Sequence, residues 1–379
     1  MRALRRWPYE GIPREPEAWL VQVARNLALD ALRRRAMADR KLAELEQWAA
    51  SAVDPVATEP KEVADDTLRL IFTCCHPALS CESRVALTLK TLCGLGVPEI
   101  ARALLAKDAT VAQRLTRAKA RLQREQVAFE VPSSDDLDGR LDSVLEVLYL
   151  LFNEGYAAAQ GEDLVRLELV REAIRLADLL LSMPRTAQPR VHALFALFLF
   201  QAARVPARQD GDGALLTLAQ QDRSRWDRRV LAAAWHHFER SMSGAEVTAY
   251  HLEAAIASAH AAAPTYAQTD WPTILRRYDQ LAALVATPIV RLNRAVAVAK
   301  VHGAAAGLAE LDALVARGQL ADYHLLHATR AQFQWSGGDR AGAMASFAAA
   351  QACACSLPER RLLEQRERAC RTGEAAPDL

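Results

Sequence analysis

The sequence predicts an all-α protein, and three observations support this fold class. The 379 residues are 51% hydrophobic but only 6% aromatic, and Gly and Pro number 16 each. Alanine, leucine and arginine, which favour helices, dominate the chain, while runs of β-branched residues are scarce. Apolar residues also recur at helical spacing in one segment after another. A chain of this length can form two or three domains with a substantial core.

The first predicted helix spans residues 17–36 and follows a proline-rich loop at residues 7–19. Leu20, Val23 and Leu27 fall on one face of this helix. Arginines gather near its C-terminal end, where positive charge also suits the helix dipole. We assign residues 1–48 to this first block. The following stretch lacks periodicity and contains two prolines, so we interpret residues 49–64 as a linker.

Two further blocks follow the linker. Short helices are predicted over residues 65–128, a break over 129–138, and a long series of helices over 139–379. Within the last block, turn-forming residues predict these interruptions: 184–189, 206–213, 264–272, 286–288 and 336–339. Residues 1–128 carry a net charge of +5 and the remainder carries −4, although the whole chain is only +1. A basic N-terminal third indicates an anionic partner for that part of the chain.

The stretch TVAQRLTRAKARLQR, residues 110–124, holds five basic side chains and no acidic one. A short amphipathic helix within residues 94–109 precedes it, ending in the predicted turn AKDA. Thr110 and Gln113 match a capping box, which predicts that the second helix begins there. The predicted buried stripe of this second helix is Val111, Leu115, Ala118 and Leu122.

This arrangement is typical of a helix-turn-helix, whose second helix reads base edges with its N-terminal residues and contacts phosphates with its later basic residues. The alternative is a solvated surface helix. A solvated helix usually mixes charge signs to form pairs four residues apart, whereas five unopposed positive charges repel one another. The pattern therefore favours contact with nucleic acid.

The segment from Glu99 to Leu122, EIARALLAKDATVAQRLTRAKARL, resembles the part of domain four of extracytoplasmic-function sigma factors that reads the −35 promoter element. PEAWLVQVARNLALDALRRR, residues 16–35, resembles the last helix of sigma domain two. Residues 65–105 and the motif FNEGY, residues 152–156, are similar to a subgroup that carries a C-terminal extension with tetratricopeptide-like repeats. The resemblance covers nearly the whole chain.

The resemblance implies a bacterial, cytoplasmic factor that lends promoter specificity to core RNA polymerase. It also implies that Met1 falls within domain two, after the helices that grip the polymerase in relatives. The opened −10 strand would be contacted by Arg25, Asn26, Arg33 and Arg34. The −35 element would be contacted by Thr110, Gln113, Arg114, Thr116, Arg117, Lys119 and Arg121.

The C-terminal block contains a repeat signal. Gly338 is followed by Ala343, Phe347 and Ala350, a small–aromatic–small pattern that is typical of the second helix of a tetratricopeptide unit. A looser version precedes it within residues 292–314. Stacked helix pairs usually form protein-binding surfaces, so a regulatory protein is a candidate partner for residues 139–379.

No catalytic motif is present in the sequence, and we predict neither an enzyme nor a cofactor or metal site. Cys74 and Cys75 are interpreted as buried small residues, because adjacent cysteines rarely both ligate one tetrahedral ion. His236 and His237 are interpreted as an exposed or packed pair. No apolar run is long enough for a membrane span. The rival to a sigma factor is a helical-repeat scaffold or adaptor with a vestigial DNA-binding region.

Overall fold

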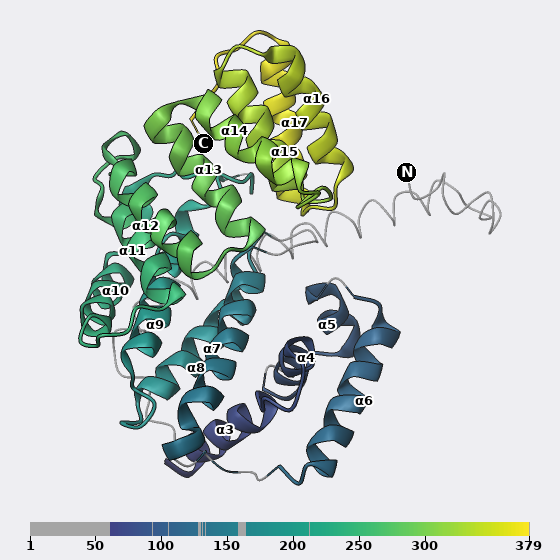
Figure 1. Ribbon diagram of the computed structural model, residues 1–379, viewed down its shortest axis with the longest axis vertical. Coiled ribbons are helices and arrows are strands. Elements are labelled where there is room, and N and C mark those ends of the chain that lie inside the picture. Colours follow the sequence, from purple (N-terminus) through teal and green to yellow (C-terminus); the bar gives the residue numbers. More distant parts are fainter. Residues whose placement is uncertain are drawn as a thin grey trace, which may run out of the picture. The chain divides into compact units, whose positions relative to one another are not determined.

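The computed structural model describes residues 61–378, apart from 93, 105, 128–129, 131, 133, 158–163 and 212 (Figure 1). All of them belong to one compact unit, Ala57–Leu379. The described residues are helical as predicted: they include no strand, only an isolated bridge between Gln209 and Leu215. None of their helices is long and apolar enough to cross a membrane.

The first four described helices are short and follow one another closely (Figure 1). They are α3 (Lys61–Cys74), α4 (Cys81–Thr91), α5 (Val97–Ala103) and α6 (Asp108–Arg124). α6 packs on α4 and α5, while α3 contacts α4. The Ser80 side chain accepts a hydrogen bond from the backbone N–H of Ser83 and so fixes the start of α4. Burial of Ile71, Phe72 and Ile100 forms the core that holds these helices together.

Three more helices come next: α7 (Ser134–Tyr156), α8 (Leu167–Leu181) and α9 (Pro189–Ala202). α9 is apolar around most of its circumference, because it packs against α7, α8, α10 (Arg228–Ser241) and α11 (Ala249–Ala262). Phe198 of α9 stacks on Phe152 of α7 with the ring centroids 4.2 Å apart. α9 is thus the central helix of this part of the protein.

The rest of the chain consists of consecutive helices that pack in pairs. They are α12 (Trp271–Leu284), α13 (Pro288–His302), α14 (Ala304–Ala316), α15 (His324–Ser336), α16 (Arg340–Ala352) and α17 (Leu357–Arg371). Several starts are set by side-chain caps. Asp270 caps α12, Thr287 caps α13 ahead of Pro288, and Ser356 forms a capping box with Glu359 on α17.

The predicted repeat residues Ala343, Phe347 and Ala350 are buried on α16, where they pack in one core cluster with Trp335 of α15. The side-by-side packing of α15 and α16 is the helix pair that the sequence pattern predicted.

Several predicted boundaries were wrong. α3 begins at Lys61, so residues 61–64 are helical rather than part of the linker 49–64. α7 begins at Ser134, inside the predicted break 129–138, because acidic residues near a helix N-terminus favour the helix through its dipole. The predicted interruption 206–213 is part of a longer one, 203–227, with two short 3-10 turns. The interruptions at 242–248, 317–323 and 353–356 were missed.

Candidate nucleic-acid interface

α6 has one buried side and one basic side. Val111, Leu115 and Ala118 are buried against α4 and α5, as the sequence predicted, and Leu122 is half-buried. Successive residues of an α-helix turn by about 100°. Gln113, directly opposite the buried side, is fully on the outer face of the helix. The same geometry places Thr116, Arg117 and Arg124 beside Gln113 on this outer face, whereas Thr110, Arg114 and Arg121 lie on the flanks of the helix.

The predicted capping box at the start of α6 was wrong. The helix begins at Asp108, two residues before Thr110, and Lys107 is the N-cap residue without a side-chain hydrogen bond. Asp108 lies in the first turn, where its negative charge is favoured by the helix dipole. α5 ends at Ala103, so the predicted turn AKDA, residues 106–109, was placed too late at its C-terminal end. Since Gln113 is not needed as a cap, its exposed amide is free to contact a ligand.

Thr116 shares the outer face with Gln113, whereas Lys119 lies on the flank of the helix. Both are exposed, but the Thr116 hydroxyl donates a hydrogen bond to the backbone oxygen of Ala112, 2.9 Å away. This local bond uses the only proton of the hydroxyl. Thr116 is therefore less suited than Gln113 to donate to a base or a phosphate.

The basic side chains of α6 differ in their partners. Nε of Arg121 lies 3.1 Å from Oε1 of Glu125, one residue beyond the basic stretch. Within the part of the chain that the structure describes, Arg117, Lys119 and Arg124 form no ion pair, and all three are exposed. A bound polyanion could neutralise these charges, whereas Arg121 would have to give up a partner.

Arg114 occupies a different environment. It is half-buried and lines a cavity of ≈ 420 Å³ together with residues of α4 and α7, among them Glu82 and Glu154. The pKa of Glu82 is lowered by a hydrogen bond from its own backbone N–H, then by the Ser80 hydroxyl, and also by the charge of Arg114. Arg114 therefore lies at the edge of the outer face, next to α7.

The helix-turn-helix part is attached to the helices that follow it. α3 contacts α7 and α8, and α4 contacts α7. Nη2 of Arg140 donates a hydrogen bond of 2.7 Å to the backbone oxygen of Phe72. Nη1 of Arg84 lies 3.2 Å from Oε2 of Glu146. Sequence reasoning missed both arginines, because nothing in the local pattern identifies partners more than sixty residues away.

Cys74 and Cys75 are buried in the core, as predicted. Burial raises the pKa of Cys74 to about 11 and that of Cys75 to about 12, so both remain neutral thiols at neutral pH.

His236 is exposed, while His237 packs with His192, with 2.9 Å between their Nδ1 atoms. The predicted contacts Arg25, Asn26, Arg33 and Arg34 lie outside the described residues.

Two segments of the chain match known protein families, and one relative matches most of its length. Residues 69–122 match the family described as "Sigma-70, region 4". A protein of Rhizobium meliloti (strain 1021), described as "Uncharacterized protein R00370", is 40% identical over 335 residues, which cover 87% of this chain and 78% of the relative. The chain belongs to the same family as this rhizobial protein. Residues 140–242 match the "Family of unknown function (DUF6596)". No solved structure matches the chain.

The region 4 match contains α4, α5, the turn and all but the last two residues of α6. It indicates a sigma factor-like role in DNA binding for residues 69–122. The outer face of α6 is therefore the candidate nucleic-acid interface. The roles of its individual residues stay predictions.

Proposed function

We propose that the protein is a sigma factor of the extracytoplasmic-function type, which directs core RNA polymerase to promoters whose −35 element is read by α6. The observation that carries this proposal is the basic outer face of α6, directly opposite the buried stripe of a sigma-70 region 4 domain. Sigma-70 region 4 in general interacts with DNA and RNA polymerase, which supports both partners.

In this proposal some residues of α6 contact bases and others contact phosphates. Gln113 and Arg114 lie in the first half of the helix and Arg117 lies just past its middle. These three would face base edges in the major groove, where Arg suits guanine and Gln suits adenine. Lys119 and Arg121 lie later and would contact phosphates. Residues 1–48 would contact the −10 element. The helices from α7 onward would form a tetratricopeptide-like extension that regulates the factor or docks a partner, without catalysis.

Promoter-directed transcription tests the proposal. The full chain is mixed with core RNA polymerase and a library of genomic promoters, and transcripts are mapped for the wild type, Arg117→Ala and Arg361→Ala. Arg361 is an exposed arginine of α17 and serves as the matched control. We expect promoter-specific transcripts that Arg117→Ala reduces about tenfold, since a good base contact contributes roughly 1–3 kcal/mol. Arg361→Ala should leave them unchanged.

DNA binding by the chain alone separates the proposal from its rival. A sigma-type reader should lose affinity steeply as salt rises, and Arg117→Ala should lower that salt slope by about one. A scaffold with a vestigial DNA reader would show neither effect. Weak, salt-insensitive binding together with an absence of promoter-specific transcripts would refute the proposed function.

A further inference from the structure

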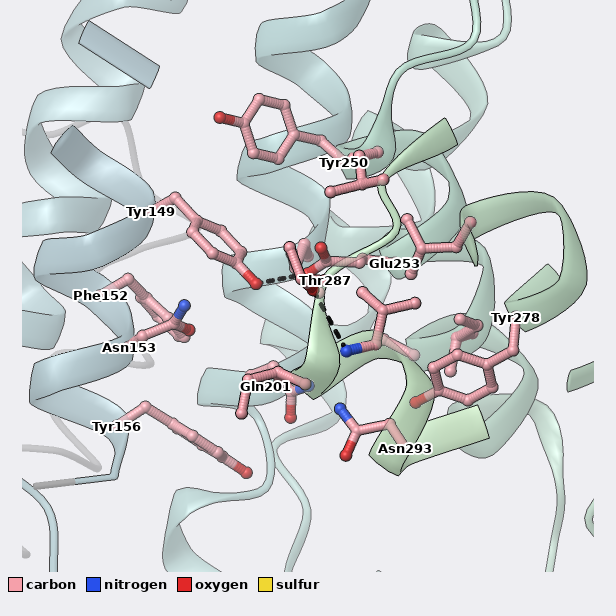
Figure 2. A pocket seen from close by; sticks show the side chains of 18 of the residues that line it. Tyr149, Phe152, Asn153, Tyr156, Gln201, Tyr250, Glu253, Tyr278, Thr287 and Asn293 are labelled. Carbon is pink, nitrogen blue, oxygen red and sulfur yellow. Dashed lines mark hydrogen bonds between the residues drawn. The ribbon is translucent and has the colours of Figure 1, made fainter. Parts of the chain in front are cut away.

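A large cavity lies among five helices of the C-terminal part, separate from the candidate nucleic-acid interface (Figure 2). Its volume is ≈ 830 Å³, and its walls come from α7, α9, α11, α12 and α13. Small-molecule sites in proteins typically measure roughly 300–1,000 Å³ and are mostly apolar with a few polar groups. The apolar part of the wall here includes Leu197, Ile256, Leu281 and Val290.

Aromatic rings are concentrated at this cavity. Four of the chain's seven tyrosines line it, although aromatic residues make up only 6% of the sequence. These tyrosines come from three helices and are Tyr149, Tyr156, Tyr250 and Tyr278. The rings of Tyr149 and Tyr250 are tilted by 47°, with their centroids 5.7 Å apart. Such rings offer π faces that attract cations.

One wall of the cavity carries a carboxyl group without a counter-ion. Oε2 of Glu253 accepts a hydrogen bond of 2.9 Å from the Tyr149 hydroxyl, as Figure 2 shows. In the described part of the chain no cationic side chain lies within ion-pair distance of Glu253. Burial raises the pKa of Glu253 to about 7. A carboxylate in such surroundings is stabilised by a positive charge that comes close to it.

The two basic side chains at the cavity do not supply this charge. The Arg204 guanidinium donates hydrogen bonds to Gln201 and Gln221 and lies over the ring of Trp226, 5.6 Å from its centroid. The pKa of His260 is lowered to about 3 by burial and by two neighbouring arginines, so its ring is neutral. A second carboxylate, that of Glu146, also lines the cavity. Since Glu146 is already paired with Arg84 of α4, the position next to Glu253 is the one that favours a positive ligand group.

We propose that this cavity binds a small organic cation, an ammonium group attached to an apolar or aromatic body, with the ammonium next to Glu253 and the body along the tyrosine wall. The ammonium would donate hydrogen bonds to the carboxylate and face the Tyr149 and Tyr250 rings. Asn293 and Tyr278, which also line the cavity, would contact polar groups on the ligand body.

The ligand would also contact α7, the helix against which α4 of the region 4 domain packs. Glu146 lines the cavity and pairs with Arg84 of α4, and Leu150 and Asn153 line both this cavity and the smaller one beside Arg114. A ligand that moves α7 would therefore change the surroundings of Arg114 on α6. This coupling rests on the proposed function, whereas binding itself does not, so the two are measured separately.

Binding is tested on the full chain by isothermal titration calorimetry at pH 8, where Glu253 is charged. The probes are phenethylammonium, hexylammonium and tetramethylammonium, with phenethyl alcohol as the neutral analogue and phenylacetate as the anionic one. We expect at least one ammonium probe to bind about tenfold more tightly than phenethyl alcohol, and phenylacetate to bind more weakly still. An equal affinity for the ammonium and the alcohol, a preference for phenylacetate, or no binding of any ammonium probe at millimolar concentration would overturn the proposal.

Two variants locate the bound cation. Glu253→Gln keeps the shape of the side chain and should weaken ammonium binding about tenfold while leaving alcohol binding unchanged. Glu239→Gln, on the exposed side of α10, is the matched control and should have no effect. Circular dichroism checks that both variants are folded. Ammonium affinity that survives Glu253→Gln would place the cation elsewhere and refute the assignment. Ligand-dependent transcription is a separate measurement, whose failure would remove only the coupling.

Discussion

Arg84 of α4 and Glu146 of α7 form an ion pair that joins the region 4 domain to the helices that follow it, with 3.2 Å between Nη1 and Oε2. The two side chains differ in burial: 14% of Arg84 and 47% of Glu146 is exposed. Since Glu146 is about half exposed to water, the pair contributes modestly to stability. Its importance lies in its position, because it connects α4, on which α6 packs, with a wall of the large cavity.

A double-mutant cycle of Arg84→Met and Glu146→Gln should give a coupling energy of roughly 0.5–1 kcal/mol in urea unfolding, because only the Coulomb and hydrogen-bond terms of the pair are lost. The coupling should shrink in high salt, which screens the exposed side of the pair. Arg294→Met with Glu310→Gln, an ion pair within the C-terminal helices, provides a comparison. Strictly additive effects of the first two substitutions would show that the pair does not hold these parts together.

Glu125→Gln should strengthen DNA binding by about twofold. The substitution removes the carboxylate that lies 3.1 Å from Arg121 and so frees that guanidinium for a phosphate. Helical ion pairs four residues apart contribute roughly 0.3–0.5 kcal/mol, which sets the size of the effect. The measurement is a fluorescence-anisotropy titration with duplex DNA at fixed salt. Glu364→Gln, an exposed residue of α17, controls for the change in net charge. An unchanged affinity in Glu125→Gln would mean that Arg121 does not contact DNA.

The sequence predicted those features that depend on local periodicity. Val111, Leu115 and Ala118 repeat at intervals set by the helix, and this spacing alone identified the buried side of α6. Ala343 and Phe347 were found in the same way. The start of α6 was placed too late, because Thr110 matches a capping signal that the helix does not use. The capping preference of one residue at a helix end contributes less than the packing of the adjacent turn, so this preference alone does not fix where the helix begins.

The large cavity could not be predicted from the sequence. Tyr149, Glu253 and Tyr278 come from three helices, and their meeting depends on how α7, α11 and α12 pack. One local signal was available: the motif FNEGY ends α7 and contains Phe152 and Tyr156, both of which line the cavity. Its glycine also has a structural reason, since it allows α8 to approach α7 closely.

Gly155→Ala and Gly139→Ala lie on the same helix and should have opposite effects on stability. A Cβ at Gly155 would lie 2.7 Å from the backbone nitrogen of Val170 and 2.9 Å from Cβ of Leu169, so α8 would have to move. We expect a loss of roughly 1–3 kcal/mol. A Cβ at Gly139 meets no atom within 4 Å, and alanine there should gain about 0.5–1 kcal/mol through helix propensity. Urea unfolding measures both. Equal effects would contradict the close approach of α7 and α8.

Glu253 should make the protein less stable as the pH rises from about 4.5 to above 7. Burial raises the pKa of this carboxyl from 4.5 to about 7 in the folded chain. The folded state therefore holds a proton that the unfolded state releases between these two values, and stability falls with rising pH in this window. The titratable groups that line the same cavity are the neutral hydroxyls of Tyr149, Tyr250 and Tyr278, the Glu146 carboxylate, the neutral His260 ring and the Arg204 guanidinium.

The measurement is the free energy of unfolding of the wild type and of Glu253→Gln at pH 5 and pH 8. Relative to the wild type, the variant should gain stability at pH 8 compared with pH 5, by at most about 3 kcal/mol for a shift of this size. A saturating ammonium ligand should abolish this pH dependence in the wild type, because it stabilises the charged carboxylate. If the two proteins follow the same pH profile, Glu253 titrates in its ordinary range and the cavity wall is more hydrated than its burial indicates.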